Sequence, residues 1–233
     1  MTPGQRDAQD CGGSTGPYRR VWSQPGFSWM TATIFLPSKN AAPPDIAIGA
    51  GETGDTPFVY TGGWGTGGQA VDAGFQYSPT FDNWALFLKF QGKPEKVANP
   101  DTRFVGGNPV QLTFEVTEDN VLLVTAEGVR QDGNPAPITV QLTPAEGVVG
   151  WPASGDGVIL KRMTSIGQMP ENLGSGTFLN NVHWQGAKIG TSAEDAVSWL
   201  ADQTGGHCMH PNNGQTVVVA FVDDSEETDN IRL

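Results

Sequence analysis

Short apolar runs recur along the chain, and clusters of Gly, Pro, Asn and Asp separate them. Runs of this length with apolar and polar alternation are typical of β-strands bounded by turns. Residues 29–36 (WMTATIFL) are rich in β-branched residues and stop before Pro37, as expected for a buried strand. Ten further strands are predicted at residues 45–50, 57–63, 70–78, 83–91, 110–116, 121–128, 138–143, 157–168, 178–189 and 216–224.

Two short loops of turn-forming residues, 79–82 (PTFD) and 117–120 (TEDN), predict antiparallel hairpins between the strands that flank them. One helix is predicted at residues 192–206, where Ser192 can cap the first turn and Gly205 can end the last. We therefore expect an all-β fold, a two-sheet antiparallel jelly-roll sandwich, with at most one short peripheral helix. We expect residues 18–233 to form a single domain and residues 1–17 to form a disordered or loosely tethered tail.

Composition narrows the class of partner. The 31 Gly and 17 Pro fit many short strands joined by turns, and the net charge of −12 would repel a phosphate backbone or an anionic bilayer. No apolar stretch is long enough to span a membrane. Nucleic acid binding and membrane insertion are therefore not expected.

The two cysteines, Cys11 and Cys208, lie near opposite ends of the chain in Gly-containing segments. We expect them to form a disulfide, which in the chain-entropy model stabilises by roughly 4 to 5 kcal/mol for so long a loop. The alternative is two free thiols in a cytosolic protein. A disulfide predicts a secreted, periplasmic or extracellular protein, although the N-terminal residues lack the pattern of a signal peptide.

An early edge strand ending in LP at Pro37 and the later hairpin at 106–128 (GGNPVQLTFEVTEDNVLLVTAEG) resemble the concanavalin A-like lectin and glucanase superfamily. The likeness covers residues 18–190 and includes the late strand at 178–190. The segment that runs from 60 to 87 is also similar to small secreted bacterial proteins of the YrpD type. These resemblances imply a two-sheet sandwich fold.

The same layout is similar to the sandwich-fold glutamic peptidases, in which a Gln just before a Gly-containing strand works with a Glu on a later strand. Here those places hold Asp72 and residues 160–165 (LKRMTS). Since a cation near Arg162 cannot replace a carboxylate that activates water, the resemblance implies the fold without the expected catalytic pair.

Strand alternation predicts one polar sheet face. At 70–78 it places Asp72 and Gln76 opposite Val71, Ala73, Phe75 and Tyr77, and at 83–90 it separates polar positions from Trp84, Leu86, Leu88 and Phe90. If the polar faces of four strands share a sheet, they form a groove suited to hydroxyl-rich ligands. Its predicted ligand-binding residues are Trp64, Asp72, Gln76, Asn83, Lys89, Arg162, Gln168, Asn181 and His183. The alternative is a solvated face in which Asp72 pairs with Arg162.

Trp64 gives this groove an aromatic platform. It lies among four glycines in the loop at 61–69 (TGGWGTGGQ), which leaves the surrounding backbone open. A Trp64 buried at one end of the sandwich is the competing interpretation. The tryptophans in apolar runs are expected in the core: Trp22, Trp29, Trp84, Trp151 and Trp184.

No cofactor or metal is expected. His207, Cys208 and His210 form the densest set of soft ligands, but the set is incomplete for zinc and the disulfide would consume the thiol. The acidic segment at 222–230 (VDDSEETDN) is expected to be solvated, and we assign no calcium site to it.

Three functions follow from the sequence. The first is a secreted lectin-like module that binds a polysaccharide or oligosaccharide. The second is a polysaccharide-degrading enzyme, either a lyase that uses His183 or Tyr77 as its base or a glycoside hydrolase that uses Asp72, although the E-x-D-x-E pattern of the glucanases is absent. The third is a non-catalytic surface or structural protein, or a distant relative of the sandwich-fold glutamic peptidases.

Overall fold

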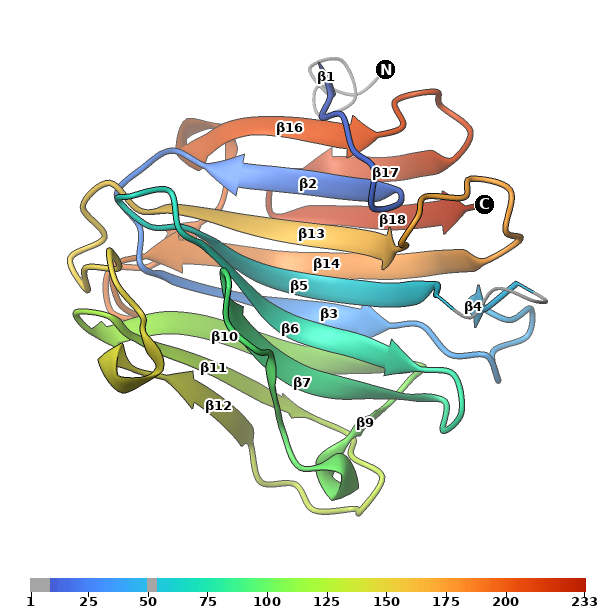
Figure 1. Ribbon diagram of the computed structural model, residues 1–233, viewed down its shortest axis with the longest axis horizontal. Coiled ribbons are helices and arrows are strands. Elements are labelled where there is room, and N and C mark those ends of the chain that lie inside the picture. The colour runs from blue at the N-terminus through green and yellow to red at the C-terminus, as the bar shows by residue number, and fades with distance from the viewer. Residues whose placement is uncertain (1–8, 50–53) are drawn as a thin grey trace.

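A computed structural model describes residues 9–49 and 54–233 as two mostly antiparallel sheets packed face to face. In Figure 1 one sheet lies in front of the other, and the strands of both run across the view. Over the described residues the helical structure consists of three single-turn 3₁₀-helices, η1 (Pro100–Thr102), η2 (Pro144–Glu146) and η3 (Ala201–Gln203). The predicted all-β sandwich is confirmed.

Sheet A is the sheet nearer the viewer in Figure 1. Its strands in spatial order are β1 (Gln9–Asp10), β16 (Thr204–His210), β2 (Tyr18–Ser23), β13 (Ile159–Gly167), β5 (Thr56–Trp64), β6 (Ala70–Ser78), β7 (Asn83–Phe90) and β8 (Lys96–Val97), with β9 (Phe104–Val105) also paired to β7. All of these pairs are antiparallel except β1 with β16. The predicted hairpin around residues 79–82 joins β6 to β7.

Sheet B lies behind. Its strands in spatial order are β12 (Ile138–Leu142), β11 (Val121–Gly128), β10 (Asn108–Glu118), β3 (Trp29–Leu36), β14 (Phe178–Gly190), β18 (Glu226–Arg232) and β17 (Val217–Asp223), with β4 (Ile46–Ala47) and β15 (Val197–Ser198) also paired to β14. The predicted hairpin around residues 117–120 joins β10 to β11. The strand that ends at Leu36 is central, because β3 pairs with β10 on one side and β14 on the other, so the expectation of an edge strand was wrong.

The core lies between the sheets and follows the predicted alternation. Val71, Ala73 and Phe75 of β6 point inward, and each is fully buried. On the facing sheet, Leu112 and Phe114 of β10 are buried in the same way. Burial of these alternate apolar positions fixes the register of each strand, because a slip by one residue would turn the whole apolar set to solvent.

The predicted helix at residues 192–206 does not form. The carboxylate of Asp195 accepts hydrogen bonds from the backbone N–H groups of Thr191 and Ser192, which closes a turn instead of starting a helix. The chain then forms β15 and η3, and Thr204 begins β16. The fully buried Trp199 anchors this segment to the core, so tertiary packing overrides the local helical pattern.

The predicted disulfide is present. It joins Cys11 to Cys208, which are 197 positions apart in the sequence. It holds the segment after β1 against β16. Disulfides persist in oxidising compartments, which fits the expected location outside the cytosol. Within the described residues, no helix is both long and apolar enough to cross a bilayer.

Candidate functional site

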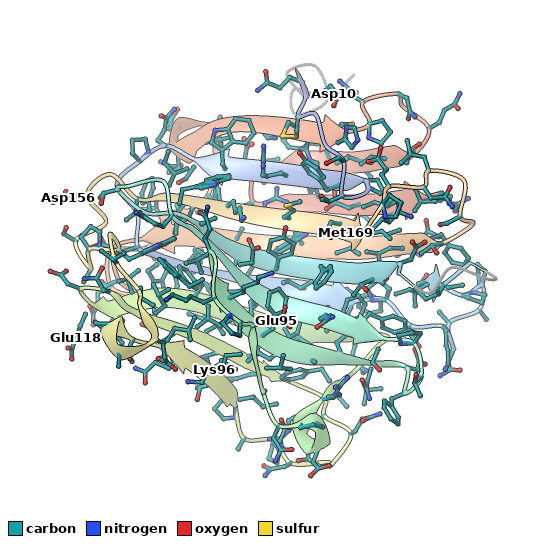
Figure 2. The ribbon with its side chains drawn as sticks, viewed as in Figure 1. Asp10, Glu95, Lys96, Glu118, Asp156 and Met169 are labelled. Carbon is teal, nitrogen blue, oxygen red and sulfur yellow. A yellow bond between two sulfur atoms is a disulfide. The ribbon has the colours of Figure 1, made fainter. Side chains whose placement is uncertain are left out.

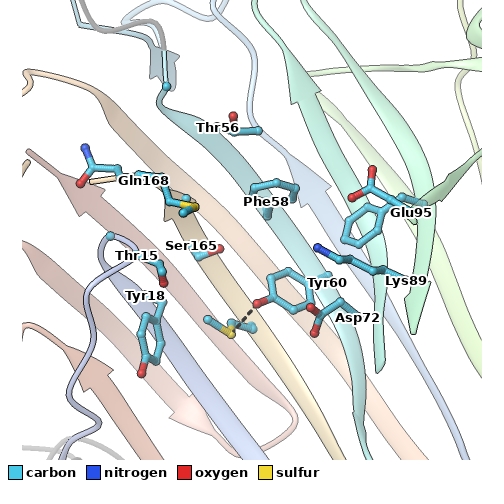
Figure 3. Close-up of a pocket in the computed structure, with 16 residues that line it drawn as sticks. Thr15, Tyr18, Thr56, Phe58, Tyr60, Asp72, Lys89, Glu95, Ser165 and Gln168 are labelled. Atoms are coloured by element: carbon cyan, nitrogen blue, oxygen red, sulfur yellow. Dashed lines mark hydrogen bonds between the residues drawn. The ribbon is translucent and has the colours of Figure 1, made fainter. Parts of the chain in front are cut away.

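A pocket of about 380 Å³ lies on the outer face of sheet A, the face turned away from the core. Glu95 and Met169, which both line it, lie over the front of sheet A in Figure 2. In the close-up, Thr15 and Tyr18 lie on one side, Lys89 and Glu95 on the other, and Phe58 between them (Figure 3). The full lining is Thr15, Gly16, Tyr18, Gly54, Thr56, Phe58, Tyr60, Asp72, Phe87, Lys89, Glu95, Met163, Ser165, Gly167, Gln168 and Met169.

An ion pair crosses the sheet at one side of this pocket. Nζ of Lys161 on β13 donates to Oδ1 of Asp72 on β6 over 2.6 Å. The strand between them is β5, whose residue in register with both is Gly62. Because Gly62 has no side chain, the Lys161 side chain can pass over β5. The Lys161 side chain is 7% exposed and that of Asp72 is 34% exposed, so the ammonium is the more deeply buried partner.

Aromatic rings surround the ammonium of Lys161. Its Nζ lies 5.3 Å from the ring centroid of Tyr60 and 5.0 Å from that of Trp64. Burial raises the pKa of the Tyr60 hydroxyl well above its ordinary value of 10, and the nearby charge of Asp72 adds to this shift. The phenol therefore stays neutral and donates a hydrogen bond to Sδ of Met163.

A second cation lies beside the first. The guanidinium carbon of Arg20 on β2 lies 5.3 Å from the ring centroid of Trp64, 5.5 Å from that of Tyr18 and 5.6 Å from that of Trp22. We call Tyr18, Arg20, Trp22, Trp64 and Lys161 the Trp64 cluster. Cation–π contacts of this kind are worth about 0.5–2 kcal/mol each, more where water is excluded.

The opposite wall of the pocket carries Lys89 and Glu95. Lys89 is in register with Asp72 across β6 and β7. The pKa of the Glu95 carboxyl is raised, because the effect of burial outweighs the lowering by the charge of Lys89. The outer face of sheet A thus carries the cations Arg20, Lys161 and Lys89 and the carboxylates Asp72 and Glu95 among aromatic rings.

The segment at residues 12–17 closes one end of the pocket. The hydroxyl of Tyr18 donates to the carbonyl of Gly12 over 2.7 Å. Gly16 (φ +97°) packs so closely that a Cβ atom there would lie 2.1 Å from the carbonyl oxygen of Ile166. The neighbouring loop is fixed by Gln168, whose Nε2 donates to Oδ1 of the buried Asp55 over 2.8 Å. Segment 12–17 and the neighbouring loop are therefore both held in place by specific contacts.

A separate cluster of charges lies between the sheets. Glu227 on β18 accepts from Nη2 of Arg19 over 2.8 Å and from Nη1 of Arg162 over 2.6 Å. All three side chains are 1% exposed. Although burial raises the pKa of Glu227, the charges of Arg162 and Arg19 outweigh it and lower the pKa to about 2.

Asp229, two residues further along β18, has the opposite shift. Burial and the charge of Glu227 raise its pKa to about 7. Its Oδ2 accepts from the hydroxyl of Thr164 over 2.6 Å, and that hydroxyl accepts from Nε1 of Trp184 over 3.1 Å. The segment that was predicted to be a solvated acidic tail therefore forms the β17–β18 hairpin, and three of its carboxylate residues, Asp224, Glu227 and Asp229, are buried.

The structure brings together five of the nine predicted ligand-binding residues. Trp64, Asp72, Gln76 and Lys89 share the outer face of sheet A, and Gln168 lines the pocket although it is mostly buried. Trp64 is half-buried and is part of the cluster of rings and cations rather than an interior plug.

Three of the other predicted residues lie elsewhere. Arg162 points into the core, because it shares its alternation with the buried Leu160 and Thr164. Asn181 and His183 belong to β14 of sheet B, where Asn181 donates to Asp45 over 2.6 Å and Nε2 of His183 lies 3.1 Å from Oε1 of Glu226. The predicted four-strand groove was wrong in this respect, since β14 lies in the other sheet.

Asn83 and Tyr77 are also outside the pocket lining. Asn83 is buried, and its amide donates to Gln131 over 2.9 Å. Tyr77 points inward and its hydroxyl donates to Asp82 over 2.9 Å. The candidate catalytic residues therefore lie in three different places. Asp72 is on the outer face of sheet A, Tyr77 is in the interior, and His183 is on sheet B.

Three residues beside the pocket were not predicted from the sequence to belong to a site: Lys161, Arg20 and Trp22. The signal for Lys161 was present, because Leu160 and Ile166 place Arg162 on the buried face and leave Lys161 on the other. Trp22 was expected in the core but is half-buried beside Arg20. Its strand, β2, was not predicted, since YRRVWS lacks a clear apolar alternation.

His207 and His210 do not meet. Nε2 of His207 lies 2.7 Å from Oδ1 of Asp224, beside the interior charge cluster. His210 lies between Asp10 and Glu171 at the outer face, with ring nitrogens 3.1 and 3.0 Å from their carboxylates. The two imidazoles cannot share a metal because they project from opposite faces of β16.

Comparisons with known proteins identify the architecture. No protein-family model matches the sequence, and no curated protein matches it. Solved structures do. The fold is similar to scytalido-glutamic peptidase with a peptide-based transition-state analogue, with 12% identity, a TM-score of 0.61, and 94% of this chain and 98% of that chain covered.

The chain has the fold of these peptidases. The same peptidase with a transition-state analogue inhibitor matches at 11% identity and a TM-score of 0.55, again covering 94% of this chain and 98% of that chain. SCP-B, a member of the eqolisin family of peptidases in a complex with the tripeptide Ala-Ile-His, matches at 11% identity and a TM-score of 0.58 with the same coverage. At these identities the likeness establishes the two-sheet sandwich and leaves function to the residues of the site.

Proposed function

We propose that the outer face of sheet A binds an extended polypeptide segment, and that it does so without the glutamic-peptidase catalytic pair. The observation that carries the proposal is the Asp72–Lys161 ion pair, which lies at the pocket between aromatic rings. Two features support it. The similar peptidase structures contain a peptide-based analogue and a tripeptide, and the pocket is an open depression across several strands.

The lining suits a polypeptide. Phe58, Tyr60 and Phe87 form a continuous aromatic patch, with Phe58 and Phe87 5.7 Å apart and Tyr60 and Phe87 6.1 Å apart between ring centroids. Such a patch contacts apolar side chains, while the carboxylates and amines around it pair with backbone or polar groups of a ligand. Gly74, in register with Tyr60 and Phe87, leaves room for the two rings to approach each other.

The same geometry argues against glutamic-peptidase chemistry. The sequence resemblance assigns the Gln and Glu of those enzymes to Asp72 and to residues 160–165, and the residue of that run that contacts Asp72 is Lys161. General-base hydrolysis needs a carboxylate that is free to take a proton from water. The Asp72 carboxylate instead accepts a charge-assisted hydrogen bond from Lys161. The pair is therefore suited to binding rather than to activating water.

Carbohydrate binding receives less support. A sugar-binding tryptophan needs an open ring face, whereas both Arg20 and Lys161 lie over the Trp64 ring. The amide and imidazole groups expected to bind hydroxyls, Asn181 and His183, are on the other sheet.

Intrinsic tryptophan fluorescence during titration with a panel of short peptides, blocked at both ends, tests the proposal. We expect saturable binding by the wild type, weaker binding by Phe58→Ala and Trp64→Ala, and no change for Thr139→Ala on the exposed face of sheet B. Mass spectrometry of the same mixtures at acidic and neutral pH checks for cleavage. Peptide cleavage that is abolished in Asp72→Asn would contradict the non-hydrolytic interpretation, and binding of oligosaccharides but not peptides would contradict the choice of ligand.

A further inference from the structure

We propose that Arg20 is a specificity residue that makes this face select polypeptides carrying a carboxylate side chain, and this inference rests on the proposed polypeptide binding. Arg20 lies on β2 in register with Met163 of the neighbouring β13, which lines the pocket. Its guanidinium is therefore beside the pocket, on the same outer face as Asp72 and Lys161.

Three rings hold the guanidinium in place. Its central carbon lies 5.3–5.6 Å from the ring centroids of Tyr18, Trp22 and Trp64. Contacts to three rings restrict the side chain without neutralising it, because aromatic faces provide no counter-charge. A cation restrained in this way before a ligand arrives loses little conformational freedom when it binds.

The guanidinium of Arg20 has an N–H donor without a hydrogen-bond acceptor. Its Nε atom is buried and has no hydrogen-bond partner among the described residues. Over the same residues, no carboxylate forms a salt bridge with Arg20, whereas Lys161 is paired with Asp72 at 2.6 Å. On the far wall, Lys89 also forms no salt bridge within the described residues, although its charge acts on the Glu95 carboxyl. Arg20 is thus a cation that aromatic rings hold in place and with which no carboxylate of the described residues pairs.

The negative net charge of the chain contrasts with the cations near the pocket. At −12 the protein as a whole repels acidic ligands, so nonspecific attraction cannot bring them to this face. Arg20, Lys89 and Lys161 nevertheless lie on the outer face of sheet A, among the carboxylates Asp72 and Glu95.

The guanidinium geometry favours a carboxylate. Its planar arrangement of N–H donors can make two parallel hydrogen bonds to the two oxygens of a carboxylate, and the flanking rings exclude water from that contact. A glutamine side chain offers one acceptor oxygen and no charge. We therefore expect a glutamate-containing peptide to bind about 10-fold more tightly than its glutamine counterpart.

The test compares two fluorescent peptides, blocked at both ends and identical except for a central Glu or Gln, by fluorescence anisotropy. The wild type should prefer the Glu peptide by about 10-fold, and Arg20→Gln should bind both with the affinity of the wild type for the Gln peptide. Arg20→Lys, which keeps the charge but not the planar donors, should retain part of the preference. Arg232→Gln on the exposed end of β18 in sheet B is the matched control and should leave the preference unchanged.

The outcomes separate the two proposals. Equal wild-type affinity for the Glu and Gln peptides would overturn the role of Arg20 while leaving polypeptide binding intact. A preference that persists in Arg20→Gln would also overturn it, since another cation would then be responsible. Failure of the wild type to bind either peptide would overturn polypeptide binding and this inference together. Circular dichroism of each variant shows that the sandwich is folded before binding is compared.

Discussion

Lys161 and Asp72 form an ion pair that spans a whole strand, with Nζ and Oδ1 2.6 Å apart on either side of Gly62. The pair depends on the backbone as well as on the two side chains. Gly62 has φ +114°, a conformation that glycine adopts readily, and a Cβ atom there would lie 2.2 Å from the carbonyl oxygen of Val71. Only glycine therefore fits at the point of β5 that lies between the two partners.

The two partners should not contribute equally to stability. In Asp72→Asn the buried ammonium of Lys161 loses its counter-charge, and we expect a loss of about 2 kcal/mol in the free energy of unfolding. Lys161→Met removes the charge but keeps much of the stem that packs on Tyr60 and Trp64, and leaves only a partly exposed carboxylate unpaired. It should cost about 1 kcal/mol or less. Urea denaturation measures both, and Lys188→Gln, on the exposed face of sheet B, is the control. A larger loss in Lys161→Met than in Asp72→Asn would contradict this account.

Substitution in the interior charge cluster should destabilise the fold more than substitution of the Asp72–Lys161 pair. Glu227 is the shared acceptor for Arg19 and Arg162, so Glu227→Gln leaves two buried guanidinium groups without their carboxylate. We expect this variant to lose about 3–5 kcal/mol in the free energy of unfolding, measured by thermal or urea denaturation. Glu226→Gln, at the adjacent half-buried position, should lose far less. Similar losses in the two variants would show that the cluster is not a source of stability.

Asp229 should make stability depend on pH. Its pKa in the folded protein is raised from 3.8 to about 7 by burial and by Glu227. Because the folded state keeps this proton while the unfolded state loses it, the contribution is complete below 3.8 and is lost as the pH rises through about 7. Relative to wild type, Asp229→Asn should therefore gain about 2–4 kcal/mol between about pH 4 and about pH 8, since Asn can still accept from Thr164. Urea midpoints at the two pH values measure the difference, and a constant offset between wild type and variant would refute the shift.

Removal of the disulfide should lower both the stability of the fold and the affinity of the pocket for its ligand. Replacing Cys11 and Cys208 together with Ser is expected to lower the free energy of unfolding by about 3–5 kcal/mol, because a long loop is no longer closed in the unfolded chain. It should also weaken ligand binding, because the segment that contributes Thr15 and Gly16 to the pocket lining is released. Binding measured well below the melting temperature separates the two effects. Unchanged affinity would mean that the contacts at Gly16 hold this wall without the disulfide.

Most of the sandwich could be predicted because its strands carry local signals. Alternation placed Val71, Ala73 and Phe75 on the buried face of β6, and the turn residues at 79–82 and 117–120 located two hairpins. The strands that were missed have few apolar residues. β18 reads EETDNIR, and only Ile231 marks the face on which Glu227 and Asp229 are buried.

The site was harder to predict because it depends on which strands are neighbours. Alternation correctly put Asp72 on a polar face, but no local pattern shows that β14 belongs to the other sheet, so His183 and Asn181 were assigned to the same groove. Lys161 is different. The buried Leu160 and Ile166 already fix its face, and the polar character of Arg162 obscured this, because a charged residue at an interior position needs a partner as distant in sequence as Glu227.

Hydrogen–deuterium exchange of the full chain, with and without a saturating mixture of blocked peptides, tests polypeptide binding on sheet A most directly. We expect slower exchange in β2, β5 and β13, which carry Arg20, Tyr60 and Lys161, and no change in β10, β11 and β12 of sheet B. Protection confined to sheet B, or the same protection in Trp64→Ala as in the wild type, would contradict the assignment of the binding face.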